Sequence, residues 1–150
     1  MTGTQRPRFR DLSREEIDAF LGDHAHGRIA YSFRDRVDIE PIHYVYHEGW
    51  IYGRTSPGAK LTLLQRSPWV AFEVDDVQGL FHWTSVVAKG TVYFVGEGAT
   101  GHSEETHALV LERLRTLVPA TMKEGDPVPE RTALFRLFVD EVRGREARNT

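Results

Sequence analysis

The feature that most constrains this fold is a run of strand-like segments whose connections are too short to contain a crossover helix. Residues 27–33 and 37–47 alternate apolar with polar side chains and are rich in β-branched and aromatic residues, and residues 50–54 follow after one more turn. Parallel neighbours need a connection of about a dozen residues or more, whereas these connections are short turns. The sequence therefore predicts an antiparallel meander.

Three helices are predicted alongside these strands. A Ser-x-x-Glu capping box at Ser13 and Glu16 indicates the start of the first helix. Ser56 as an N-cap, with Pro57 in the first helical position, indicates the start of the second. Apolar residues at helical spacing predict the third over residues 104–118.

Further strands are predicted at residues 69–76, 82–96 (bent at Gly90) and 132–142. With them the fold class is mainly β, an antiparallel barrel of about six strands and three helices. The length of 150 residues suits one domain, over residues 12–142. Residues 1–11 are expected to form a flexible arm, and residues 143–150 a polar tail that frays.

Composition excludes several classes of protein. The chain has no cysteine, which rules out disulfides, cysteine-ligated zinc, iron–sulfur clusters and a cysteine nucleophile. A formal net charge of -3 gives no general attraction to nucleic acid or to an anionic membrane. The N-terminus does not resemble a signal peptide, and no apolar run approaches the roughly 18 residues of a membrane span. We therefore expect a cytoplasmic protein with neither nucleic acid nor membrane as a partner.

Residues 96–101, with the sequence GEGATG, match the G-x-G-x-x-G pattern between a strand and a helix. In a Rossmann fold this pattern places a pyrophosphate at the helix N-terminus. Here the helix leads to Pro119 and a proline-rich loop, not to a parallel strand with an acidic residue. A flexible glycine-rich link is therefore the favoured interpretation.

The histidines and acidic residues do not predict a metal site or a catalytic acid or base. His24 and His26 are one residue apart, and His43 and His47 share a strand face, but neither pair has a third ligand at diagnostic spacing. His43 is interpreted as lining a pocket or as hydrogen-bonded in the barrel. No Ser-His-Asp or Glu-Glu arrangement has a persuasive local context, so any reaction would have to come from a cofactor.

The segment RTSPGAK at residues 54–60 is a more specific candidate, because it leads from a strand to a helix start. The free N–H groups and the dipole of a helix N-terminus attract an anion. Arg54 and Lys60 supply positive charge, and the hydroxyl of Thr55 or Ser56 can donate a hydrogen bond. This combination suits a phosphomonoester. The alternative is an N-capped surface helix with two solvated cations.

Four motifs follow one another along residues 10–145: LSREEIDAFLGDHAHGRIAYS, PIHYVYHEGWIYGRTSPGAKL, RSPWVAFEVDD and WTSVVAKGTV. In this order and spacing they resemble the FMN-binding split-barrel family related to pyridoxamine-phosphate oxidase. The nearest branch includes the nitroimidazole-resistance reductases. The resemblance implies a split β-barrel that binds FMN.

The resemblance also implies ten cofactor-binding residues, namely Ile42, His43, Tyr44, Arg54, Thr55, Ser56, Lys60, Trp83, Ser85 and Val86. Thr55, Ser56 and Lys60 would contact the phosphate and the ribityl chain, and Arg54 would stand near the flavin. Residues 42–44 would offer backbone groups along the isoalloxazine edge. Trp83, Ser85 and Val86 would complete the pocket, from the same chain or from the other protomer.

Two departures narrow the implied activity. Arg54 stands where nitroimidazole-resistance members often have histidine, so the sequence does not support nitroimidazole chemistry. Residues 138–150 lack the arginine- and histidine-bearing segment that true pyridoxamine-phosphate oxidases use for their substrate, so the chain is not expected to be a true pyridoxamine-phosphate oxidase. The prediction is an FMN-dependent oxidoreductase, a reductase of a small acceptor with NAD(P)H as a candidate donor.

Three alternatives remain open: a barrel that binds the deazaflavin F420, a heme-binding barrel with His43 as the first ligand to check, and a non-catalytic flavin sensor. A homodimer is also expected, because the family builds each FMN pocket from two chains. Trp69, Phe72, Phe81 and Trp83 support this expectation, since one small core cannot easily hide so many aromatic residues.

Overall fold

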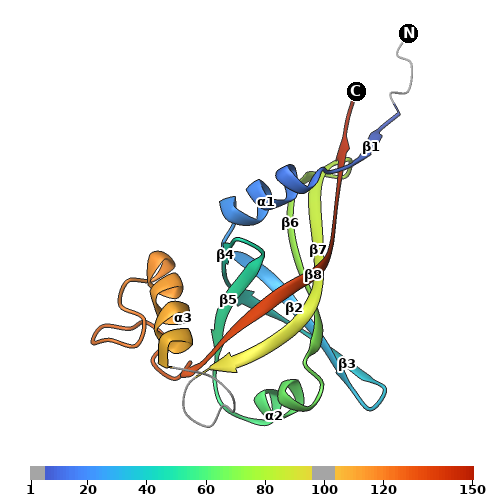
Figure 1. Cartoon of the computed structure of the whole chain (residues 1–150). Helices are drawn as coiled ribbons and strands as arrows, with labels where there is room; N and C mark the ends of the chain where they lie inside the picture. Colours follow the sequence, from blue (N-terminus) through green and yellow to red (C-terminus); the bar gives the residue numbers. More distant parts are fainter. Residues whose placement is uncertain (1–5, 96–103) are drawn as a thin grey trace.

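The computed structural model describes residues 6–95 and 104–150 (Figure 1). In chain order its elements are β1 (Arg8–Asp11), α1 (Arg14–Asp23), β2 (His26–Phe33), β3 (Arg36–His43), β4 (Val45–His47), β5 (Trp50–Thr55), α2 (Ala59–Arg66), β6 (Trp69–Gly79), β7 (His82–Val95), α3 (Glu104–Leu117) and β8 (Ala133–Arg148). The predicted class, mainly antiparallel β with three helices, is confirmed. The described residues form eight strands instead of about six, because β1 is added and the 37–47 segment divides into β3 and β4.

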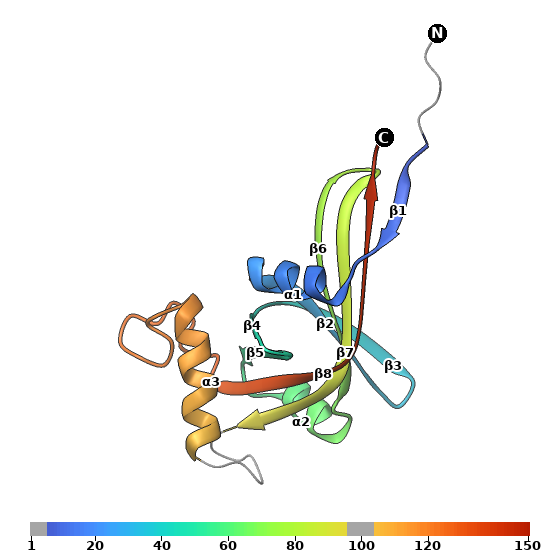
Figure 2. The same cartoon turned by 45° about the horizontal axis from the view of Figure 1, so that its top comes forward.

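All these strands belong to one sheet that curls back on itself. The strand order is β3-β2-β6-β7-β8-β5-β4, with β1 beside β8, and every pairing is antiparallel. The two end strands, β3 and β4, are consecutive in the chain and only Tyr44 separates them. The sheet must therefore curve until its ends approach each other, as Figures 1 and 2 show.

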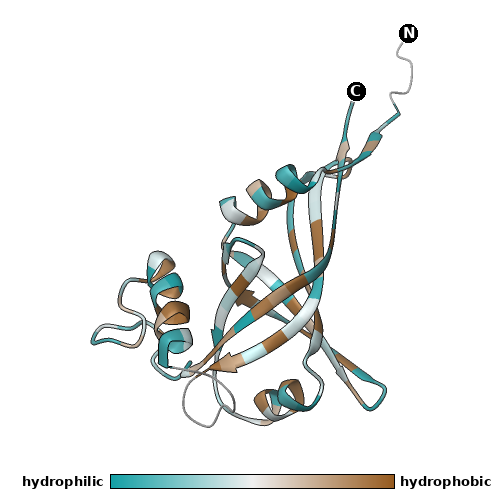
Figure 3. Cartoon of the chain, in the orientation of Figure 1, coloured by the Kyte–Doolittle hydropathy of each residue, from teal (hydrophilic) through white to brown (hydrophobic). Residues whose placement is uncertain are grey.

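Apolar residues recur along the long strands, as the brown segments of Figure 3 show, and those on alternate positions of β6 and β7 are buried. Val74 and Val86 are register partners on β6 and β7, and both are fully buried. The Tyr44 ring packs against Phe72 at 5.1 Å, and its hydroxyl donates to the Leu21 carbonyl of α1 at 2.7 Å. Phe72 is thus a core residue, and its expected part in a dimer surface was wrong.

The predicted bend at Gly90 is confirmed as a register shift between β7 and β8. Lys89 pairs with Glu141 and Gly90 pairs with Val139, so Asp140 bulges out of the ladder. A Cβ atom on Gly90 would lie 1.7 Å from the Phe138 carbonyl oxygen. Only glycine allows the two backbones to approach this closely.

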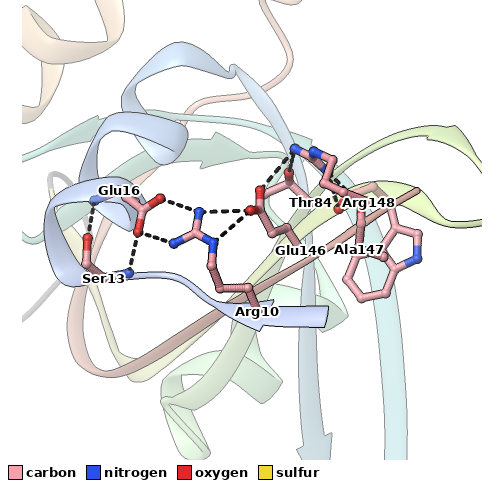
Figure 4. Close-up of polar contacts among 8 residues, drawn as sticks. Arg10, Ser13, Glu16, Thr84, Glu146, Ala147 and Arg148 are labelled. Atoms are coloured by element: carbon pink, nitrogen blue, oxygen red, sulfur yellow. Dashed lines mark hydrogen bonds and ion pairs between the residues drawn. The ribbon is translucent and has the colours of Figure 1, made fainter. Parts of the chain in front are cut away.

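The two chain ends depart from expectation, because they pair with each other. β1 lies beside the end of β8, with Asp11 opposite Arg145. Arg10 joins the two ends to α1, donating to Glu16 at 2.6 Å and to Glu146 at 2.9 Å (Figure 4). The expectation of a loose arm and a frayed tail was therefore wrong for residues 8–11 and 143–148.

The predicted start of α1 is confirmed, and the predicted start of α2 is not. The capping box at Ser13 and Glu16 is present, with both reciprocal hydrogen bonds (Figure 4). The helix α2, however, begins at Ala59 with Gly58 as its N-cap, and the predicted cap at Ser56 was wrong. Gly58 has φ 155° and ψ -162°, which is not helical and delays the helix. No helix among the described residues is long and apolar enough to cross a membrane.

Candidate functional site

The candidate site lies where β5 ends and α2 begins. Thr55, the last residue of β5, is buried and pairs with Ala133 at the start of β8. The exposed Ser56 follows, and the chain then enters α2, which carries Lys60 in its first turn. The ammonium group of Lys60 forms an ion pair with the Glu40 carboxylate on β3. The site thus joins the edge of the sheet to the N-terminus of a helix.

Partial burial and a second cation act on Lys60. Burial lowers the pKa of the Lys60 ammonium, and the positive charge of Arg131 lowers that pKa further. Arg131 lies in the loop just before β8 and was not identified from the sequence. No local motif marks it, since only the pairing of β5 with β8 brings it near residues 55–60.

His43 lies on the exposed side of the end of β3. Its ring contacts the ring of His26 on β2, with 5.3 Å between centroids. Partial burial lowers the pKa of the His43 imidazole, and the charges of His26 and Arg131 lower it further. Arg131 therefore acts on His43 as well as on Lys60, and its positive charge favours the neutral form of both side chains.

Residues 42–44 differ in what they can offer a ligand. The side chains of Ile42 and Tyr44 are buried in the core. Tyr44 donates its N–H to the Ala25 carbonyl, on the β2 side. Because bonded and non-bonded pairs alternate along an antiparallel ladder, the N–H and C=O of His43 point away from β2. Among the three residues, His43 therefore offers both backbone groups at the edge of the sheet.

Arg54 is occupied by a buried ion pair. Its guanidinium donates two hydrogen bonds of 2.7 Å to the Asp126 carboxylate, and the two side chains are only 9% and 2% exposed. Asp126 also accepts from the N–H groups of Met122 and Val128. These bonds hold the pKa of Asp126 well below its usual range, the Arg54 guanidinium being the largest cause. Arg54 therefore anchors the loop after α3.

Residues 83–86 lie far from Lys60 within the chain. They stand near the β6–β7 turn, at the opposite end of the molecule from α2 (Figures 1 and 2). Trp83 packs against Phe9 at 6.2 Å, and the Ser85 hydroxyl donates to Glu73 at 3.3 Å. Val86 is fully buried in the core. The structure thus does not bring residues 83–86 and Lys60 into one pocket within a single chain.

A polar cluster missed by the sequence analysis surrounds Ser85 on the outer face of the sheet. Arg28 on β2 approaches Glu73 at 3.1 Å and Asp75 at 3.5 Å. Partial burial, and then Asp75, raise the pKa of the Glu73 carboxyl. Glu73 and Asp75 lie two positions apart on β6. Because this spacing is common on any solvated strand face, it is not a specific sequence signal for the cluster.

A hollow of about 600 Å³ lies between the β2–β3 hairpin and α2. Its lining residues are Tyr31, Phe33, Arg34, Arg36, Val37, Asp38 and Leu63. The Tyr31 hydroxyl lies 3.4 Å from a carboxylate oxygen of Asp38 and of Glu40, and its one proton can be donated to either. Glu40 therefore links this hollow to the Lys60 ion pair.

The remaining sequence motifs add no ligand set. Across residues 6–95 and 104–150, no group of three or more histidine or acidic residues is placed to hold a metal ion. The ring of His24 bonds to the Phe20 carbonyl oxygen at 2.8 Å, and His47 lies beside Glu48. The glycine-rich pattern at residues 96–101 lies outside the described residues.

Comparison with known proteins agrees with this architecture. The family model described as "Pyridoxamine 5'-phosphate oxidase" matches residues 13–146. A search of curated proteins finds no match.

Several solved structures are similar to this chain. A FAD-binding protein from Mesorhizobium loti is 25% identical, with a TM-score of 0.76 over 93% of this chain and 99% of its own. The FAD binding protein from Mycobacterium smegmatis is 23% identical, with a TM-score of 0.63 over 91% and 99%. A FAD and heme binding protein from the same organism is 15% identical, with a TM-score of 0.65 over 90% and 71%.

Proposed function

The chain belongs to the pyridoxamine 5'-phosphate oxidase family, and on that premise we propose that it is an FMN-dependent oxidoreductase that reduces a small acceptor. The observation that carries the proposal is the position of Lys60 in the first turn of α2, directly after β5, where the pairing of β5 with β8 also brings the loop that carries Arg131. Similarity to FAD-binding proteins supports a flavin. Of the flavins, FMN ends in a phosphomonoester, which suits a compact cationic site.

The chemistry of the donor set fits FMN. The Lys60 ammonium would form a charge-assisted hydrogen bond to the phosphate, exchanging its present partner Glu40 for it. The first-turn N–H groups of α2 and the exposed Ser56 hydroxyl would donate to the same group. The backbone groups of His43, which point away from β2, would bond the polar edge of the ring.

The chain's own part in the reaction is to bind and orient. When bound, the flavin supplies the redox chemistry. Lys60 and the helix start fix the phosphate end of the cofactor, while β3 positions the ring. No side chain is assigned as a catalytic acid or base.

We also propose that the site is shared between two chains. The start of β7, which carries Trp83 and Ser85, lies at the opposite end of the protomer from α2, which carries Lys60, so a pocket that uses both groups needs a partner. Large apolar side chains are exposed, including Phe9 at 50%, Trp69 at 46% and Phe81 at 38%. A second copy would bury such a surface, because stable dimer interfaces are large and apolar.

The test is the absorption spectrum of the purified protein, followed by titration with FMN and with riboflavin. We expect a yellow protein, or one that becomes yellow with FMN, and tighter binding of FMN than of riboflavin. Equal affinity for the two ligands would contradict the phosphate site. A deazaflavin or a heme spectrum would replace FMN by the corresponding alternative cofactor, and reduction by NAD(P)H in stopped flow would separate a reductase from a sensor.

A further inference from the structure

Arg131 has a defined position beside the start of the phosphate segment. Thr55 pairs with Ala133, so the antiparallel register carries Arg131 alongside the residues that follow Thr55. The N–H of Arg131 donates to the Val128 carbonyl at 3.0 Å, which fixes the backbone of this turn. The residue is therefore held next to the entry into α2.

The Arg131 side chain is partly buried, and the described residues offer it no hydrogen bond or ion pair. Its charge nevertheless reaches His43 and Lys60, since it lowers the pKa of both. Two acidic groups act on Lys60: Glu40 forms an ion pair with it, and the charge of Asp38 raises its pKa. Neither forms an ion pair with Arg131 among the described residues. An unpaired guanidinium beside another cation is stabilised when an anion lies between them.

The loop that carries Arg131 is anchored from within. Asp126 receives both hydrogen bonds from Arg54, which belongs to β5, and accepts from the N–H of Val128. Val128 in turn accepts from Arg131 through its carbonyl. A continuous path of hydrogen bonds therefore runs from β5 through Asp126 and Val128 to Arg131.

We propose that Arg131 is a second phosphate-binding residue of the site and that Arg54 and Asp126 are positioning residues that hold it there. The inference rests on the proposed FMN site. It adds a second cation to that site and assigns the Arg54–Asp126 ion pair to hold this cation in place. Two cations at one site favour a dianionic phosphomonoester over an uncharged alcohol. Arg54 then acts on the cofactor only through Arg131.

The first test measures FMN and riboflavin affinities of the full chain carrying Arg131→Gln. Loss of a charge-assisted hydrogen bond should weaken FMN binding roughly 10- to 100-fold and leave riboflavin unchanged. Arg131→Lys should restore part of the affinity, because it keeps the charge. Arg66→Gln, an exposed arginine in the last turn of α2, removes the same charge elsewhere and should change neither affinity. In the protein without flavin, Arg131→Gln should also raise the pKa of His43, followed by NMR.

The second test is a double-mutant cycle with Asp126→Asn. If Asp126 acts through Arg131, Asp126→Asn should weaken FMN binding when Arg131 is present. The same change should cause little further loss of FMN affinity in the Arg131→Gln background. Additive losses would overturn the positioning role. Thermal unfolding of each variant shows whether the chain remains folded, and the Arg131→Gln and Arg131→Lys pair tests the binding role without touching the buried ion pair.

The outcomes separate this inference from the proposed function. Wild-type binding of FMN that Arg131→Gln leaves unchanged would overturn the inference and leave the FMN site standing. A wild-type protein that binds no FMN would overturn both. An equal loss for FMN and riboflavin would show that Arg131 supports the fold, which also contradicts the inference.

Discussion

Lys60 shows how one side chain in this site is subject to opposing effects. The Glu40 carboxylate stabilises its charged form, whereas burial and Arg131 favour the neutral form. A phosphate that displaces Glu40 would supply negative charge to both cations. The contribution of Lys60 to binding therefore depends on its charge and much less on its packing.

Lys60→Ala is expected to weaken FMN binding far more than riboflavin binding. A charge-assisted hydrogen bond is worth about 1.5–3 kcal/mol, which corresponds to roughly 10- to 100-fold in affinity. The fold should survive, because alanine is a better helix former than lysine. Paired flavin titrations at modest salt check this, and a difference below about twofold between the ligands would return Lys60 to a solvated surface role.

At the scale of elements, close backbone contacts and helix caps hold the barrel together. β7 pairs with β8 through a bulge, and there the backbone of Gly90 packs closely against the Phe138 carbonyl. The start of α1 is fixed by the capping box, and Arg10 ties that box to β8 through Glu146 (Figure 4). The bulge supports the pairing of β7 with β8, and the capping box supports the start of α1. The first is therefore sensitive to added side-chain volume, and the second to protonation of Glu16.

Gly90→Ala is expected to destabilise the protein by about 1–3 kcal/mol or more, because the added methyl group would force β7 and β8 apart. Gly22→Ala in α1 is the matched control. A Cβ atom there meets nothing within 4 Å, and the change should stabilise the helix by up to about 1 kcal/mol. Urea denaturation of the two variants measures both effects, and equal stabilities would contradict the close approach.

Glu16 is expected to make stability sensitive to acid. Hydrogen bonds from Arg10, and then from the Ser13 backbone, lower its pKa from 4.5 to about 2. The contribution of Glu16 to the free energy of unfolding is therefore complete above the unfolded pKa of 4.5 and is lost as the pH falls through the folded pKa of about 2.

The corresponding measurement is the thermal midpoint between pH 6 and pH 2. The wild type should lose stability over the acid part of this range, and Glu16→Gln should show a shallower dependence. Glu15→Gln, an exposed neighbour in the same turn, should follow the wild type. A wild-type slope retained in Glu16→Gln would remove Glu16 as its source.

At the scale of the whole molecule, the start of β7 and the helix α2 lie at opposite ends of the protomer, and they carry two of the three groups of expected cofactor residues (Figures 1 and 2). Lys60 stands at the α2 end, and Trp83 stands beside Phe9 near the chain termini. A pocket that combines them can form only between two chains. The proposed dimer is therefore a condition for the proposed site.

Complementation between two variants tests the shared pocket. Lys60→Ala and Trp83→Ala should each bind FMN poorly, because each damages both sites of a homodimer. When the two variants are mixed and refolded together, heterodimers should regain one intact site of the two. Titration of the mixture measures the recovered sites, and sedimentation measures the dimer. A mixture that binds no better than its components, or a flavin-loaded monomer, would contradict the shared site.

The sequence by itself determined what depends on neighbouring residues. Short connections required antiparallel strands, the Ser13–Glu16 spacing produced a capping box, and Gly90 marked the bend, because each of these depends on local geometry. Only the tertiary structure decided that Arg54 binds Asp126 and that the pairing of β5 with β8 brings Arg131 beside the segment that leads to Lys60. Those pairings join segments far apart in the chain, and their partners follow from strand order and register, which local propensity does not specify.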